Sequence, residues 1–201
     1  MDLPLEAGER YGLFVIDMQY DGVDPDSALP AQGAVDIIPT IQKLIEVARA
    51  HDWPVIHSRH EHREDLSDFG LSRFIEPPSC IEGTRGARII DELAPAEGDI
   101  VVTKRRYSTF QNTELDLILR QLGVRGLITC GILTDACVFS TVAQGRGLDY
   151  KFWMVADALA GSTPARHEAT LENMSVWLAD VRDAAWAKQT MAANAGGWTT
   201  A

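Results

Sequence analysis

Three side chains that could act together in catalysis follow short apolar runs of the chain. Asp17 ends the run GLFVID, Lys104 ends DIVVTK, and Cys137 comes shortly after RGLITC. A thiol can attack a carbonyl carbon once a neighbouring group has removed its proton, and a carboxylate can serve as that base. An ammonium group beside them would stabilise the thiolate. These residue types indicate nucleophilic catalysis by cysteine, provided that the fold brings them together.

The stretch LITCGILTDACVFST (127–141) holds two of the three cysteines, and their surroundings differ. Cys130 closes an apolar strand-like run, so we expect it to pack as a small buried hydrophobic residue. Cys137 lies in the first turn of a predicted helix, with Thr134 or Asp135 as its N-cap. There the helix dipole should lower the thiol pKa, and unpaired backbone N–H groups can hold an oxyanion. Cys137 is therefore the candidate nucleophile, although the Asp135 carboxylate would oppose the lowering of its pKa.

Short β-branched runs alternate with segments of helical period along the chain. The runs are continuously apolar, which is typical of parallel strands covered on both faces. We expect strands at 12–17, 53–58, 99–104, 125–130 and 150–157 with a short sixth around 178–181, and helices at 35–51, 112–123, 134–147, 165–178 and 183–194. This alternation predicts a three-layer α/β/α fold with a mostly parallel, doubly wound, six-stranded sheet. Ligands bind beyond the carboxyl ends of the strands in such sheets, where the three candidate catalytic residues would converge.

Composition and charge limit the class of protein. The 201 residues are enough for one domain, 1–201, with a full hydrophobic core. The formal net charge of −11 argues against binding to nucleic acid or to an anionic membrane surface. Three cysteines without a framework spacing argue against a disulfide-stapled secreted fold, and no apolar run reaches the ~18–20 residues of a membrane span. The sequence starts without a signal-peptide pattern, so a cytoplasmic location is expected.

Three motifs resemble those of the isochorismatase-like cysteine hydrolase superfamily, which includes nicotinamidase, N-carbamoylsarcosine amidohydrolase, maleamate amidohydrolase and biuret hydrolase. VIDMQ (15–19) resembles its first-strand motif with the catalytic Asp. VVTKRRYSTF (101–110) resembles the segment with the catalytic Lys, and GILTDACV (131–138) resembles the nucleophile motif. The similarity extends from about residue 11 to about residue 182 and includes GTRGARIIDELAP and VADALAG.

The resemblance assigns roles to individual residues. It implies that Cys137 is the nucleophile, that Asp17 is the general base and acid, and that Lys104 stabilises the thiolate. It also implies a cis peptide bond between Ile132 and Leu133, and an oxyanion hole formed by the backbone N–H groups of Leu133 and Cys137. The implied activity is hydrolysis of a small carboxamide, carbamoyl or ureido compound through a thioester, with release of ammonia and without a cofactor.

Alternatives to this activity stay open. Another small-molecule bond could be the target, such as an ester or the vinyl ether cleaved by isochorismatase, although the vinyl-ether branch typically lacks the cysteine. The chain could also be a nicotinamidase-type, metal-assisted amidase, or a catalytically idle scaffold that keeps the fold. A redox pair of Cys130 and Cys137 is disfavoured because these residues form no C-x-x-C motif.

The segment RHEHREDLSD bears on the question of a metal. Nicotinamidases of the superfamily usually carry a metal site with the pattern D-x-H and a second His six residues later. Here His60 stands at the Asp position, His62 is kept, and Asp68 stands at the later His. Two histidines and a carboxylate can bind a divalent metal, so these three are candidate ligands. The alternative is a solvated segment with incidental histidines. The departure from the pattern favours no metal, and the segment is more similar to the N-carbamoylsarcosine and biuret amidohydrolase branch.

Further residues near the motifs are candidate substrate contacts. A guanidinium can bind a carboxylate or carbonyl group bidentately, and three arginines are candidates for such a clamp: Arg105, Arg106 and Arg166. Three aromatic side chains could wall the pocket: Tyr20, Tyr107 and Phe110. For each arginine the alternative is a surface charge, and for each aromatic residue it is generic packing.

The expected partners follow from the resemblance and the charge. A small-molecule amide is the expected substrate, and neither nucleic acid nor membrane is an expected partner. The resemblance implies a homo-oligomer, a dimer or a tetramer. The charged segment 59–98, which interrupts the strand–helix alternation, would then serve as an interface or as a lid.

Overall fold

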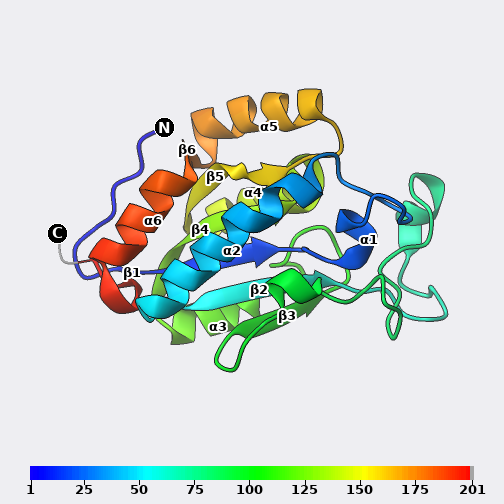
Figure 1. Cartoon of the computed structure of the whole chain (residues 1–201), viewed down its shortest axis with the longest axis horizontal. Coiled ribbons are helices and arrows are strands. Elements are labelled where there is room, and N and C mark those ends of the chain that lie inside the picture. Colours follow the sequence, from blue (N-terminus) through cyan, green and yellow to red (C-terminus); the bar gives the residue numbers. More distant parts are fainter. Residues whose placement is uncertain (200–201) are drawn as a thin grey trace.

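Six parallel strands form the central sheet of the computed structural model, which describes residues 1–199 (Figure 1). The strands are β1 (Arg10–Ile16), β2 (Val55–His60), β3 (Ile100–Lys104), β4 (Val124–Ile132), β5 (Lys151–Ala160) and β6 (Asp180–Arg182). Their order across the sheet is β3-β2-β1-β4-β5-β6, and every neighbouring pair is parallel. The predicted doubly wound α/β fold is confirmed, and the sheet is parallel throughout.

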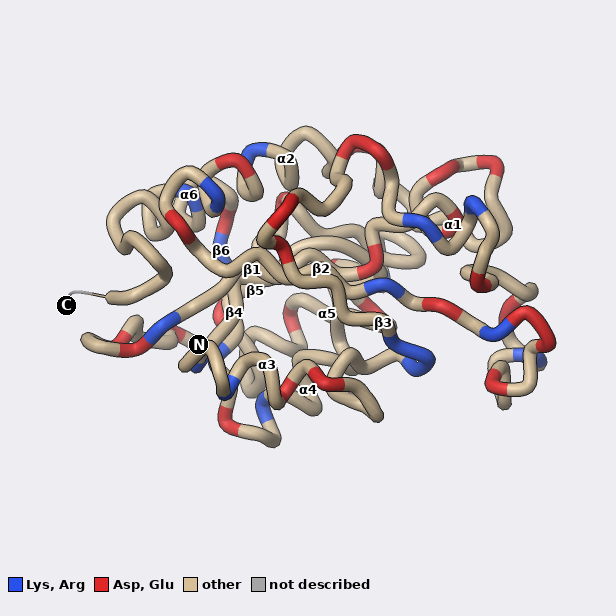
Figure 2. The backbone as a smooth tube through the Cα atoms, turned by 90° about the horizontal axis from the view of Figure 1, so that it is seen from below, with Lys and Arg blue, Asp and Glu red and all other residues tan. Residues whose placement is uncertain are grey.

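Helices cover both faces of this sheet, as Figures 1 and 2 show. One face carries α2 (Ala34–Ala50) and α6 (Ala184–Ala193), and the other carries α3 (Leu115–Gln121), α4 (Phe139–Gly147) and α5 (Pro164–Trp177). A short helix, α1 (Tyr20–Val23), follows β1. None of the helices in the described residues combines the length and the apolarity that crossing a membrane requires.

Two side-chain caps explain where the last two long helices begin. The hydroxyl of Thr163 accepts a hydrogen bond from the N–H of Arg166 at the start of α5, and Asp183 accepts one from the N–H of Trp186 at the start of α6. The helix α3 is shorter than the predicted 112–123, because Asn112 adopts a positive φ of 57° and thus lies outside helical geometry.

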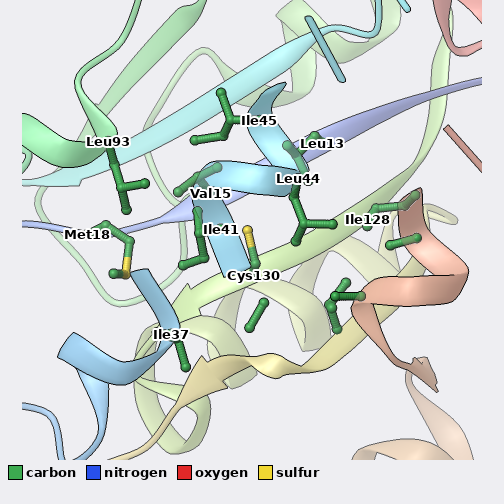
Figure 3. Packing of buried hydrophobic residues seen from close by; sticks show 14 of the residues in the cluster. Leu13, Val15, Met18, Ile37, Ile41, Leu44, Ile45, Leu93, Ile128 and Cys130 are labelled. Atoms are coloured by element: carbon green, nitrogen blue, oxygen red, sulfur yellow. The ribbon is translucent and has the colours of Figure 1, made fainter. Parts of the chain in front are cut away.

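The apolar core between α2 and the sheet supports the strand ends (Figure 3). Ile41 and Leu44 of α2 pack over Val15 of β1 and Cys130 of β4, and all four are at most 1% exposed. Burying one such aliphatic side chain contributes about 1.5–3 kcal/mol. The prediction that Cys130 packs as a buried hydrophobic residue is confirmed.

The strand order reverses between β1 and β4. From β1 the chain winds outward to β2 and β3, and from β4 it winds the other way to β5 and β6. In sheets of this kind a crevice forms beyond the carboxyl ends of the strands at such a reversal. The segment after β2 lies at this end of the molecule, beside α1 in Figure 1, and includes the 3₁₀ helices Gly70–Phe74 and Asp91–Leu93.

Candidate active site

Asp17, Lys104 and Cys137 meet at the carboxyl ends of β1, β3 and β4. The Nζ atom of Lys104 lies 2.7 Å from Oδ2 of Asp17 and 3.2 Å from Sγ of Cys137. Lys104 is fully buried, and Asp17 and Cys137 are 7% and 8% exposed. The structure thus brings together the three side chains that the sequence singles out as a catalytic group.

The strand neighbouring β1 fixes the carboxylate of Asp17. Asp17 is the first residue after β1, and its positive φ of 51° turns the chain away from the strand direction. On β2, the hydroxyl of Ser58 donates to Oδ1 of Asp17 over 2.6 Å, and the carbonyl and hydroxyl oxygens of Ser58 lie within hydrogen-bond distance of the N–H of Asp17. Sequence reasoning missed Ser58, because a serine in an apolar strand is informative only once the register of β1 and β2 is known.

Besides its ion pair with Asp17, the ammonium group of Lys104 has three hydrogen-bond acceptors within reach. It donates to Nδ1 of His60 over 3.0 Å, to the backbone oxygen of Arg106 over 3.1 Å and to Sγ of Cys137. Since β3 is an edge strand and β2 lies between it and β1, the long side chain must reach past the end of β2, where His60 pairs with Lys104 in the register. Oδ2 of Asp17 is buried and forms an ion pair with this ammonium, yet no described residue donates a well-aligned hydrogen bond to it.

Burial and charge set the resting protonation of the lysine and the cysteine. Burial lowers the pKa of Lys104, but the neighbouring Asp17 and Cys137 raise it more, so the net pKa lies above that of a free lysine. Burial raises the pKa of the Cys137 thiol, and the Lys104 ammonium offsets only part of this rise. The prediction that a helix N-terminus lowers the pKa of Cys137 is therefore wrong, since burial is the larger effect.

Cys137 lies in a π-helical turn, Thr134–Val138, which precedes α4. The backbone oxygen of Leu133 accepts the N–H groups of Ala136 and Val138, each over 3.0 Å. The peptide bond between Ile132 and Leu133 is cis.

The predicted side-chain cap of this turn is wrong, because Leu133 occupies the N-cap position and no side chain caps it. The hydroxyl oxygen of Thr134 instead lies 2.9 Å from Nδ1 of His167. The carboxylate of Asp135 accepts hydrogen bonds from the N–H and the hydroxyl of Ser162. The side chain of Asp135 is thus used to tie the turn to the start of α5.

A cavity of about 160 Å³ opens onto Cys137. Its lining residues include Leu133 and Ala136 of the nucleophile turn, Tyr107, and Cys80, and burial raises the pKa of the Cys80 thiol to about 12. Gln19 also lines it and ties the end of β2 to the following segment: its amide nitrogen donates to the backbone oxygens of His60 and Ala87. Neither Gln19 nor Cys80 stood out in the sequence, because their place in the wall depends on how the segment after β2 folds back.

Among the predicted substrate contacts, the structure places only Tyr107 at this cavity. Phe110 is buried and stacks on Tyr150 at 5.4 Å between ring centroids. The guanidinium of Arg85 covers the ring of Tyr20, and Arg166 donates to the hydroxyl of Ser162.

The two neighbouring arginines bind protein groups, and both line an adjoining cavity that Tyr107 also lines. Arg105 donates to the backbone oxygen of Glu61 over 2.8 Å and pairs with Glu82 over 3.0 Å, and Arg106 donates to the backbone oxygen of Asp68 over 2.8 Å. These guanidinium groups hold the segment after β2, and the arginine clamp stays a prediction.

The three candidate metal ligands form a row. Nε2 of His60 lies 2.9 Å from Nε2 of His62, and Nδ1 of His62 lies 3.1 Å from Oδ2 of Asp68. His62 thus uses opposite ring nitrogens for its two neighbours, so the donor atoms do not surround one point, as a tetrahedral or octahedral ion requires.

A second donor set lies within the site itself. Donor atoms of Asp17, His60 and Cys137 lie within 4.8 Å of one another, but the ammonium of Lys104 contacts all three. A metal ion there would have to displace this ammonium. Burial and the nearby Lys104 also keep the pKa of His60 well below its usual value, so its ring is neutral. The residues present do not fit a nicotinamidase-type metal site.

Comparisons with known proteins agree with this geometry. A family model described as the isochorismatase domain matches residues 11–185. A probable inactive nicotinamidase of Arabidopsis thaliana is 33% identical over 176 residues, which cover 84% of this chain and 90% of that protein. Ureidoacrylate amidohydrolase of Azorhizobium caulinodans is 32% identical over 203 residues, which cover 88% of this chain and 89% of that protein.

A solved structure shares the whole fold. The crystal structure of an isochorismatase-like hydrolase from Alkaliphilus metalliredigens superposes with a TM-score of 0.84 at 32% identity, covering 90% of this chain and 98% of that one. The family match, the full-length relatives and the parallel six-stranded sheet lead to one conclusion. The chain belongs to the isochorismatase-like hydrolase family.

Proposed function

We propose that the protein is a cysteine-dependent amidohydrolase that cleaves a small carboxamide, carbamoyl or ureido compound and releases ammonia. One observation carries this proposal: a buried ammonium, that of Lys104, bridges the carboxylate of Asp17 and the thiol of Cys137 at a cavity. A carboxylate and a thiol held on one cation give a base next to a nucleophile. The amidohydrolase among the relatives supports the choice of an amide bond.

The first half of the reaction forms a thioester. Oδ2 of Asp17, the buried oxygen without a hydrogen-bond donor among the described residues, takes the proton of the Cys137 thiol. Sγ then attacks the carbonyl carbon, while the Lys104 ammonium stabilises the developing negative charge. The tetrahedral oxyanion is held by the backbone N–H groups of Leu133 and Cys137, the predicted oxyanion hole. Asp17 returns the proton to the departing nitrogen, the C–N bond breaks, and ammonia leaves.

The second half regenerates the free thiol. Asp17 takes a proton from a water molecule, and the hydroxide attacks the thioester carbon. The same backbone donors hold the second oxyanion. The C–S bond then breaks, the acid product leaves, and the proton on Asp17 returns to the sulfur of Cys137. No proton is gained or lost by the protein over the cycle.

The walls of the cavity favour a small substrate without negative charge. Its volume of about 160 Å³ lies below the ~300–1,000 Å³ of pockets for drug-sized ligands. Two carboxylates line it besides Asp17, those of Asp21 and Glu76, and no Arg or Lys side chain does so within the described part of the chain. A carboxylate on the substrate would meet like charges within this cavity. We infer that uncharged or cationic amides are preferred.

Ammonia release from three matched ureas tests both the amidohydrolase activity and the preference for uncharged or cationic substrates. N-ethylurea is neutral, N-(2-aminoethyl)urea is cationic and N-carbamoylglycine is anionic, while the reacting carbamoyl group is the same in all three. The proposal expects release from the neutral or cationic compound, with kcat/KM at least about tenfold above the anionic one, as one unfavourable charge contact predicts. Glu76→Gln should lower the ratio of kcat/KM for the neutral or cationic urea to kcat/KM for the anionic urea. Asp91→Asn, which alters an exposed acid outside the cavity, should leave this ratio unchanged.

The charge preference and the amidohydrolase activity fail by different results. Preference for the anionic urea would contradict the charge preference and leave the amidohydrolase intact. Absence of ammonia release from these ureas and from nicotinamide and maleamate would contradict the amidohydrolase itself. It would favour an idle scaffold, the state that the name of the Arabidopsis relative describes for that protein.

A further inference from the structure

Lys104 is the first member of a row of hydrogen bonds that leads away from the reacting groups. Its Nζ lies 3.0 Å from Nδ1 of His60, and the row continues through Nε2 of His60 and the ring of His62 to the carboxylate of Asp68. The catalytic cycle above gives no task to His60, His62 or Asp68. They also occupy the positions of the metal-site pattern, which is altered at His60 and Asp68, so their arrangement needs another explanation.

The chemistry of the two ends fixes the direction of each hydrogen bond. An ammonium group can only donate, so Nδ1 of His60 must accept, and the proton of a neutral His60 ring is on Nε2. That proton is donated to Nε2 of His62, whose own proton is therefore on Nδ1. A carboxylate can only accept, so this last proton is donated to Asp68. All donors point from Lys104 towards Asp68.

The opposite tautomer of His60 would be incompatible with the site. It would place an N–H bond against the buried Lys104 ammonium, which would lose His60 as an acceptor and keep Asp17, Cys137 and the backbone oxygen of Arg106. The ammonium would then turn or shift away from the opposing N–H bond, and its position 3.2 Å from Sγ of Cys137 would change. Nucleophilic catalysis depends on such positions to within about 1 Å.

We propose that His60 is a positioning residue for Lys104, and that His62 and Asp68 hold His60 in the only tautomer that can accept the ammonium N–H. The row of two histidines and one carboxylate thus holds the catalytic cation by hydrogen bonds, at positions where the nicotinamidase pattern places metal ligands. The expected effect of His60 on kcat rests on the proposed amidohydrolase function. The tautomers assigned to His60 and His62 do not.

The far end of the row is firmly anchored. Oδ1 of Asp68 accepts the backbone N–H of Arg63 over 3.0 Å, and Nη1 of Arg106 donates to the backbone oxygen of Asp68. Arg106 follows Lys104 by two residues, and its own backbone oxygen accepts a hydrogen bond from the ammonium. The segment that carries the catalytic lysine therefore also holds the backbone of Asp68, whose carboxylate orients the histidines.

Substitutions at His60 test the kinetic consequence. His60→Ala removes the acceptor and should lower kcat about 10²-fold, with KM changed less than about threefold. His60→Asn can place an amide oxygen near the Nδ1 position and should recover at least about tenfold of that loss. The control is His57→Asn, which alters a buried histidine of the same strand whose ring faces Asp99, and should change kcat less than about threefold. Equal kcat for His60→Ala and His60→Asn, or no loss in either, would overturn the positioning role.

Nitrogen NMR on protein labelled with ¹⁵N-histidine tests the structural content without any substrate. Among the five histidines, His60 and His62 are assigned by the loss of one set of signals in His60→Asn and in His62→Asn. In the wild type we expect His60 to carry its proton on Nε2 and His62 to carry its proton on Nδ1. Asp68→Leu should reduce the population of that tautomer at His62. A proton on Nδ1 of His60, or a charged ring at either position near neutral pH, would overturn the inference even if the amidohydrolase activity were established.

Discussion

Lys104 is the residue on which the site depends electrostatically. It carries a positive charge at a fully buried position, where an isolated ion would cost several kcal/mol. Asp17 supplies the opposite charge at 2.7 Å, and His60 and the backbone oxygen of Arg106 supply neutral acceptors. The arrangement keeps the lysine charged, and a charged lysine is what makes the neighbouring sulfur a usable nucleophile.

Breaking this ion pair should destabilise the protein. Asp17→Asn leaves the ammonium without its counter-ion and should lower the free energy of unfolding by about 3 kcal/mol, measured by denaturant titration. The double variant Asp17→Asn with Lys104→Met removes both charges and should recover most of that loss. If the double variant were as unstable as Asp17→Asn alone, the loss in the free energy of unfolding would not come from the broken ion pair.

At the scale of single residues, the type and place of a residue in the chain could be predicted, but its surroundings could not. Asp17, Lys104 and Cys137 each stand where an apolar run ends, and parallel strands bring such ends together. The direction of the shift in the Cys137 pKa was predicted wrongly, because the sequence shows a helix start but not the burial around it. Ser58 and His60 touch the catalytic residues through the register of β2 with its neighbours, which no local pattern reveals.

At the scale of elements, one carboxylate joins three of them. Asp99, just before β3, lies 3.3 Å from Nε2 of His57 on β2 and pairs with Arg49 near the end of α2. Burial raises the pKa of Asp99, but the hydrogen bonds from His57, Arg49 and the N–H of Ala96 lower it more, so the folded pKa lies below its usual value. The exposed 95–99 connection is thereby tied to the buried sheet.

This lowered pKa predicts a loss of stability in acid. The stabilisation by Asp99 is complete above its unfolded pKa of about 3.9 and is lost as pH falls below that value, since the unfolded chain then binds the proton first. Asp99→Asn should therefore be less stable than the wild type at pH 7, with a smaller decrease in the free energy of unfolding between pH 4 and pH 2. Denaturant titrations between pH 4 and pH 2 give the free energy of unfolding of both proteins. If it falls equally with pH in Asp99→Asn and in the wild type, the contribution assigned to Asp99 is refuted.

The row His60–His62–Asp68 predicts the response to chelation. Because the donors do not surround one point and an ammonium lies among the others, ammonia release should be unchanged after exhaustive treatment with a metal chelator. The control is the same treatment followed by added zinc. Activity that is lost on chelation and restored by zinc would show that the segment does hold a metal.

The helix around Cys137 shows what the sequence could not provide at this scale. The periodicity predicts a regular helix from 134 with a side-chain cap, and the structure has a π-helical turn in which Thr134 and Asp135 contact α5 and its start. These contacts come from a helix some thirty residues later in the chain, so the local pattern cannot report them.

At the scale of the whole molecule, the sheet reversal explains why the site lies where it does. Residues from β1, β2, β3 and the turn after β4 meet because the winding changes direction between β1 and β4. This architecture could be predicted from the alternation of apolar runs and helical segments. The course of the segment after β2 could not, because its charged sequence has no period, and it is this segment that supplies Glu76 and Cys80 to the cavity.

The homo-oligomer stays a prediction at this scale. Leu71, Phe74 and Ile75 are 78%, 71% and 73% exposed and lie together in and just after the 3₁₀ helix Gly70–Phe74. Neighbouring exposed apolar side chains are typical of surfaces covered by a second copy. Sedimentation velocity should give two or four times the mass of one chain. A single species with the mass of one chain at all concentrations would contradict this expectation.

The most direct test of the central claim is the rate of ammonia release by Cys137→Ala. We expect a loss of at least about 10³-fold in kcat, since the atom that attacks the carbonyl carbon is gone. Cys130→Ala is the matched control: it removes a buried thiol seven residues earlier and should keep kcat within about threefold while costing about 1 kcal/mol of stability. Ammonia release by Cys137→Ala within tenfold of the wild type would contradict the assignment of the nucleophile.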